Sequence, residues 1–143
     1  MGAQKKFHEE WSIVATIDPI DANNADSSAD EIDMSKFSEI AVIVLLGVLN
    51  DSATNEITVQ DSVTAGGSLT TITGKTQSIV GTDDAKQFVI SVRSDEMNAG
   101  ARYITVKQAN SAHSQLMAMI ILGKPYYGPA TANDLSTVQT IVD

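Results

Sequence analysis

The sequence predicts an all-β protein: an antiparallel β-sandwich or jelly-roll-like domain of about eight strands, with extended N- and C-terminal arms. Three observations lead to this fold class. Short segments alternate apolar and polar residues with a period of two, β-branched residues dominate them, and Gly, Asn, Asp and Ser separate them at short intervals. Since no long amphipathic helix interrupts these segments, parallel α/β folds are excluded.

The predicted strands follow one another closely along the chain. In order they are residues 11–18, ended by Pro19; 31–33; 39–49; 56–62; 68–73, closed by Gly74; a weaker segment 77–80; 87–93; 102–108; and 116–122, stopped by Gly123. The last run contains Met and Ala, which favour a helix. It is too short and too uniformly apolar for a surface helix, so we predict a buried strand. Residues 34–37 are expected to form a single helical turn.

The segment 39–49 is apolar on both of its alternating faces. A strand of this kind is expected at the centre of a sheet and covered on both sides, as in a sandwich. Residues 21–30 contain almost no large apolar side chain and are predicted to be a long, solvated loop.

The chain divides into three parts. We predict an N-terminal arm over residues 1–10, the β-sandwich over 11–123 and an extended C-terminal arm over 124–143. The C-terminal arm has scattered apolar side chains but no pattern that would give it a core of its own. Its residues predicted to bind a partner are Tyr126, Tyr127, Leu135, Val138 and Ile141.

Composition limits the possible partners. The 143 residues fit one domain, and 9 Lys+Arg against 18 Asp+Glu give a net charge of −9. An acidic surface is repelled by phosphate backbones and anionic lipids, so neither nucleic acid nor membrane is an expected partner. The longest apolar stretch, residues 40–49, is far shorter than the roughly 20 residues of a membrane-spanning helix. No targeting segment is recognisable, which predicts synthesis in the cytoplasm.

No catalytic, cofactor or metal site is predicted. His8 and His113 lie in polar segments outside any hydrolase motif, and the chain has no cysteine for a zinc site or a nucleophile. Asp18, Asp21 and Asp26 offer oxygen ligands but lack the D-x-D-x-D-G register of calcium loops, so a solvated loop is favoured and calcium stays open. Gly66-Gly67 lacks the context of a phosphate loop.

The order of the segments resembles the capsid decoration proteins, or head-stabilising cement proteins, of tailed bacteriophages. The likeness begins at Glu31 and runs to the C-terminus. It consists of IDMSKF leading into a hydrophobic strand, FVISVR and RYITV around a loop, AMIILG, and a tail rich in Tyr and Pro that ends in NDL and a valine. The resemblance implies a β-sandwich or jelly roll on the virion surface. It carries over no functional residue.

The expected function is therefore that of a non-enzymatic virion protein, which binds the outside of a phage capsid and stabilises it by bridging major capsid subunits. Its expected partners are the major capsid protein and further copies of itself, a trimer being slightly favoured over a dimer. Two alternatives remain. One is a tail or head-fibre component of a phage. The other is a carbohydrate-binding or adhesin-like sandwich, although only seven aromatic residues are available to form a sugar platform.

Overall fold

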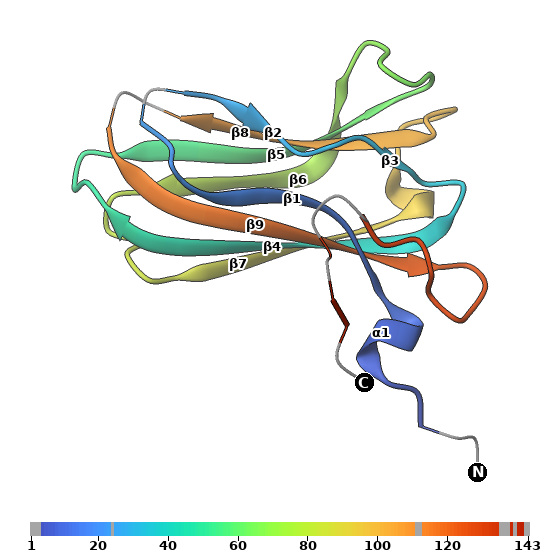
Figure 1. The fold of residues 1–143 in the computed structure, drawn as a ribbon. Helices are drawn as coiled ribbons and strands as arrows, with labels where there is room; N and C mark the ends of the chain where they lie inside the picture. Colours follow the sequence, from blue (N-terminus) through green and yellow to red (C-terminus); the bar gives the residue numbers. More distant parts are fainter. Residues whose placement is uncertain (1–3, 24, 111–112, 135–137, 139, 142–143) are drawn as a thin grey trace.

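The computed structural model describes residues 4–23, 25–110, 113–134, 138 and 140–141. The chain forms two antiparallel β-sheets that pack face to face (Figure 1). The elements are α1 (Phe7–Glu10), β1 (Ser12–Asp21), β2 (Ser27–Ser28), β3 (Ile32–Asp33), β4 (Phe37–Leu49), β5 (Thr54–Ser62), β6 (Thr70–Val80), β7 (Gln87–Arg93), a short 3₁₀ turn (Ser94–Glu96), β8 (Tyr103–Asn110) and β9 (Gln115–Pro125). The predicted all-β sandwich is confirmed.

The strand order is that of a jelly roll. Sheet A has the order β1-β9-β4-β7 and sheet B the order β2-β8-β5-β6. Both β2 and β3 pair with β8, so together they occupy the place of one interrupted strand. Counted in this way, the described chain has eight strands, four in each sheet. With the exception of the β5–β6 hairpin, successive positions alternate between the two sheets, which gives the two interlocked Greek keys of this architecture.

The core lies between the sheets and is built from alternate residues of each strand. In β4, Ile40, Val42 and Val44 are fully buried, and the residues between them face outward. Ile57 in β5 and Ile104 in β8 are equally buried from the side of sheet B. Since each fully buried aliphatic side chain contributes about 1.5–3 kcal/mol, this double layer is the main source of stability.

Three strands continue through residues that the local sequence predicts as strand ends. At Gly123 in β9, a side chain would collide with the ring of Phe37, since a Cβ would lie 2.7 Å from its Cδ1 atom. In β6, Gly74 takes φ = +77° within an irregular part of the pairing with β5, and the strand runs on. β1 passes Pro19 at a register shift, which is tolerated because β1 is an edge strand.

Three local predictions are also corrected. Residues 34–37 form a hydrogen-bonded turn, with Phe37 N donating to Met34 O at 3.4 Å, and not a helical turn. The N-terminal arm is not wholly extended, since Phe7–Glu10 makes one turn of helix. The polar loop contains β2, whose pairing with β8 is reinforced by Asp26, which accepts from Asn110 N. Whether residues 1–10 and 124–143 are separate from the sandwich as domains stays a prediction.

The prediction that the strand at residues 39–49 is central and covered on both sides is correct only in part. It is central, between β9 and β7, as predicted. Its inner face is covered by sheet B, but its outer face remains accessible, since Leu45 is 37% exposed. Within the described part of the chain, β4 is therefore covered on one side only.

A lysine joins the two sheets at their β6 and β7 edges. Lys75 Nζ in β6 donates to the carbonyl oxygen of Ser91 in β7 at 2.6 Å. The same ammonium group pairs with Glu96 Oε1 at 3.1 Å. Since Glu96 Oε2 also accepts from Arg93 N, the three groups fix the turn that follows β7.

Candidate partner-binding surface

The N- and C-terminal segments of the described chain lie side by side at one end of the sandwich (Figure 1). Ala130 N donates to Glu9 O at 2.8 Å, so the C-terminal segment is tied to α1. Further along, Asp134 N donates to Ile13 O at 2.7 Å, and Ile13 N donates to the side-chain oxygen of Asn133 at 3.0 Å. The C-terminal segment thus lies along the start of β1 and partners its backbone.

An apolar cleft of about 330 Å³ lies between these two segments. Phe7, Trp11 and Ile13 line it from the N-terminal side, and Val138 and Ile141 line it from the C-terminal side. Phe7 is 58% exposed and Ile141 46% exposed. The cleft therefore presents apolar side chains to solvent, as a site for an apolar side chain of a partner would.

The two tyrosines of the tail have different surroundings. Tyr126 is anchored, since its hydroxyl donates to Ser94 Oγ at 2.8 Å and its backbone N donates to Lys36 O. Tyr127 is 89% exposed. The ring of Trp11 is covered in part by the ammonium group of Lys124, 5.8 Å from the ring centroid. Tyr127 is thus the aromatic side chain most available to a partner among these three.

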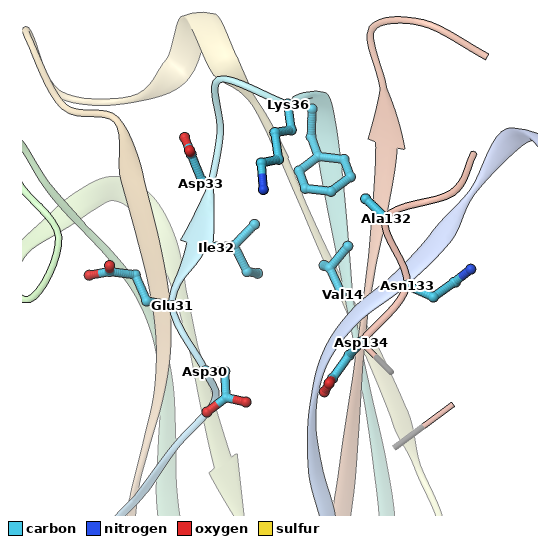
Figure 2. A pocket seen from close by; sticks show the side chains of 10 residues that line it. Val14, Asp30, Glu31, Ile32, Asp33, Lys36, Ala132, Asn133 and Asp134 are labelled. Atoms are coloured by element: carbon cyan, nitrogen blue, oxygen red, sulfur yellow. The ribbon is translucent and has the colours of Figure 1, made fainter. Parts of the chain in front are cut away.

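A second, more polar hollow lies where the C-terminal segment crosses β1 near β3 (Figure 2). Its apolar floor is formed by Val14, Ile32 and Phe37, and its walls by four carboxylates and Lys36. These carboxylates are Asp30, Glu31, Asp33 and Asp134. Glu31 accepts from Gly66 N, and Asp33 accepts two hydrogen bonds from Arg102.

Among the described residues, Asp33 and Arg102 form a strongly perturbed ionisable pair. Arg102 Nε and one terminal nitrogen donate to the two oxygens of Asp33 at 2.8 and 2.7 Å. These hydrogen bonds hold the pKa of the Asp33 carboxyl far below its usual value and raise the pKa of Arg102. Since Asp33 is in β3 and Arg102 precedes β8, the pair fastens the short strand to its neighbour.

The three aspartates considered for calcium have separate structural partners. Asp18 accepts from Thr16 Oγ1, Asp21 accepts from Ser114 Oγ and Gln115 N, and Asp26 pairs with Lys107 at 3.4 Å. Over the described ranges, no three His, Asp or Glu side chains are close enough together to hold a metal ion.

The predicted partner-binding residues are brought together in part. Val138 and Ile141 share the apolar cleft, and Tyr126 and Tyr127 lie just beyond the end of β9. Leu135 lies outside the described residues. Phe7 and Trp11, which form the opposite wall of the cleft, were not among the predicted residues. Their four-residue spacing was the available signal, but only the fold shows that it meets the C-terminal segment.

No protein-family model matches the sequence, and no curated protein matches it. Similar solved structures include a chain of the disulfide-linked pili of Bacillus endospore appendages, 15% identical over 87% of this chain and 99% of that chain, with a TM-score of 0.44. Another is the Clostridium thermocellum xylanase 10B with its CBM22-1 and GH10 modules, complexed with xylohexaose, 9% identical over 82% and 26% of the two chains, TM-score 0.44. The Tobacco streak virus coat protein is 11% identical over 87% and 93%, TM-score 0.35.

These likenesses concern β architecture alone and carry no argument about function. Regarding membranes, the described residues include no helix that is long and apolar enough to cross a bilayer.

Proposed function

We propose that this chain is a non-enzymatic structural protein of a tailed-bacteriophage virion, which binds the outside of the capsid and bridges major capsid subunits. Two observations support this proposal: the sequence resemblance and an exposed apolar surface. The last four residues of RYITV, a motif of the resemblance, begin β8, and its Arg102 lies immediately before the strand. The surface is the end of the molecule where the N- and C-terminal segments meet.

The observation that carries the proposal is the exposure of apolar side chains on these terminal segments. Phe7, Tyr127 and Ile141 are 58%, 89% and 46% exposed. Exposed aromatic and aliphatic groups on short segments suit contacts that cross from one subunit to the next. On a lattice of identical sites such contacts add through effective concentration, so a modest surface is sufficient.

Binding to capsids tests the proposal directly. The purified protein is mixed with expanded capsids of the phage that encodes it, and the bound fraction is measured by co-sedimentation. We expect saturable binding, and we expect the double variant Tyr127→Ser/Ile141→Ser to bind at least about tenfold more weakly, since central aromatic contacts commonly account for 2 kcal/mol or more. The matched control is Val63→Ser/Leu69→Ser, whose side chains are exposed on or next to the β5–β6 turn.

Two results would contradict the proposal. One is a protein that does not bind capsids, and the other is a terminal-segment variant that binds them as tightly as the unchanged protein does. Electron micrographs of complete virions separate decoration of the head from a place in the tail or a head fibre. A glycan array tests the carbohydrate-binding alternative, which requires saturable binding to a sugar.

A further inference from the structure

The inner faces of three strands change from aliphatic to amide side chains at one end of the sandwich. In β8 the inward residue that follows Val106 is Gln108. In β5 and β9 the inward positions at the same end are Asn55 and Gln115. Asn110 lies opposite Asn55 in the register of β5 and β8. Four amide side chains therefore share this end, and we call Asn55, Gln108, Asn110 and Gln115 the amide cluster.

Three members of the amide cluster are removed from solvent. Gln108 and Gln115 are fully buried, and Asn55 is 5% exposed. Burial of an amide costs free energy unless both its oxygen and its NH₂ group find hydrogen-bond partners. Since core positions of this kind are normally aliphatic, the cluster requires a specific set of partners.

The amide nitrogen atoms of the two glutamines have partners within the chain. Gln108 Nε2 donates to Asn55 Oδ1 at 3.2 Å. Gln115 Nε2 donates to Asn110 Oδ1 and, at 3.0 Å, to the carbonyl oxygen of Thr54. Because Gln115 begins β9 and Thr54 begins β5, the amide cluster links sheet A to sheet B through the core.

The side-chain oxygen atoms of Gln108 and Gln115 have no hydrogen-bond partner in the described part of the chain. Exchanging O and N within an amide does not remove this deficit. At Gln115 it would place Oε1 against the oxygen atoms of Thr54 and Asn110. At Gln108 it would place Oε1 against Asn55 Oδ1, and turning Asn55 as well would leave Gln108 Nε2 unpaired instead. The two buried oxygen atoms therefore require a donor from outside the cluster.

We propose that internal water donates hydrogen bonds to Gln108 Oε1 and to Gln115 Oε1, so that the amide cluster is a water-binding site inside the sandwich. Both atoms are acceptors, and the ligand must therefore be a donor. A water molecule offers two hydrogen atoms, and buried water typically makes about three hydrogen bonds to polar groups of this kind. Water held in this way completes the polar link between the two sheets.

A neutral donor fits the amide cluster better than a cation does. The described groups that bond to its side chains are other amides, backbone carbonyl oxygens and the sulfur atom of Met117, all of them uncharged. A buried ammonium ion would lack a counter-charge there. A calcium ion takes about 6–8 oxygen ligands, whereas the cluster offers the unpaired oxygen atoms of Gln108 and Gln115.

Solvent reaches the edge of the amide cluster. A hollow of about 340 Å³ lies at the same end of sheet B and is lined in part by Thr54, Asn55 and Ala109. The proposed water can therefore exchange with solvent at this side, although Gln108 and Gln115 are themselves fully buried.

A high-resolution crystal structure of the unchanged protein tests the inference. We expect electron density for water at about 2.7–3.2 Å from Gln108 Oε1 and from Gln115 Oε1, as one shared molecule or as two. Absence of such density at either oxygen would overturn the inference. So would side chains turned to pair both oxygens with protein donors, or a peak surrounded by five or more oxygen atoms, which identifies a cation.

Magnetic relaxation dispersion of the water ¹⁷O nucleus measures long-lived internal water in solution. The double variant Gln108→Leu/Gln115→Leu removes both acceptors and should lower the number of such waters by about one or two per molecule. The matched control is Gln87→Leu at an exposed position in β7, which should leave the number unchanged. A folded double variant that retains every long-lived water would contradict the inference.

The crystal structure requires no substitution, so the inference can be tested even if the double variant does not fold. Neither measurement involves capsids. The result is therefore independent of the proposed function, and a failure of capsid binding does not affect it.

Discussion

In sheet B, Thr58 lies between Lys107 and Thr76, whereas at the corresponding centre of sheet A, Ile43 lies between Ile120 and Val89. The inner faces of the two sheets show no such contrast, since Ile57 and Val42 are both fully buried. One sheet thus has the polar outer face of an ordinary sandwich, and the other has two apolar faces. The difference teaches that folding of one chain requires only a single apolar face per sheet.

The largest expected effects test whether the inner faces are equivalent. Ile121→Ala in β9 and Ile104→Ala in β8 each remove a fully buried side chain, one from each sheet. Each should lower the free energy of unfolding by about 2–5 kcal/mol, through lost burial and a residual cavity. Urea denaturation measures this. As a control, Ile43→Ala on the outer face should cost about 1 kcal/mol or less. A large cost there would mean that the outer face is already covered within one chain.

A second pair of substitutions compares glycines that serve different purposes in the two sheets. Gly123→Ala in sheet A should cost about 1–3 kcal/mol, because the new methyl group collides with Phe37 and Val14. Gly74→Ala in sheet B meets no atom within 4 Å, but its φ of +77° is strained for alanine and should cost about 1–2 kcal/mol.

Asparagine distinguishes these two causes. Gly74→Asn should be better tolerated than Gly74→Ala, because asparagine adopts left-handed conformations more readily. At position 123 the larger side chain should be worse than alanine. The reverse order at either position, in thermal or urea unfolding, would contradict the assigned cause.

A smaller effect is expected when the outer face of sheet A is made as polar as the outer face of sheet B. Ile43→Thr/Val89→Thr replaces two aliphatic side chains by the residue type found at Thr58. The fluorescence of a hydrophobic dye bound to the folded protein should decrease, since less contiguous apolar surface is available. Monomer stability should change by no more than about 1 kcal/mol in total. Val63→Thr, outside both faces, serves as the control and should leave dye binding nearly unchanged.

The smallest effect concerns an ion pair at the edge of sheet B. Arg102 lowers the pKa of Asp33 below its ordinary value of 3.8, so the folded protein holds this proton less tightly than the unfolded chain. The resulting stability is present above about pH 4 and is lost as the pH falls through the folded pKa. Asp33→Asn should lower Tm by a few degrees at pH 7 and should abolish this part of the acid dependence. A variant whose Tm falls with acid as steeply as that of the unchanged protein would contradict the assignment.

Alternation was sufficient to predict the sandwich and its long strands, because a period of two determines which residues share a face. It missed β2, whose two serines carry no apolar signal. It was not sufficient for the ends of the strands. Pro19, Gly74 and Gly123 read locally as stops, and only the partner strand or the Phe37 ring explains why the chain continues. Nor could alternation show that β4 is covered once, since an apolar residue predicts burial without specifying what buries it. The terminal cleft was likewise predictable only in part. The apolar residues of the tail pointed to Val138 and Ile141, whereas only the folded structure shows that Phe7 lines the same cleft.

Lys75 has a consequence beyond the joining of two sheets. Strands at the margin of a sheet expose backbone groups that invite further chains to add on, the route to fibrous aggregates. The ammonium group of Lys75 donates to the carbonyl oxygen of Ser91 on β7, a strand at the margin of sheet A, and is held there by its ion pair with Glu96. An incoming strand would have to displace both. The lysine therefore protects this edge of sheet A against the addition of a further strand.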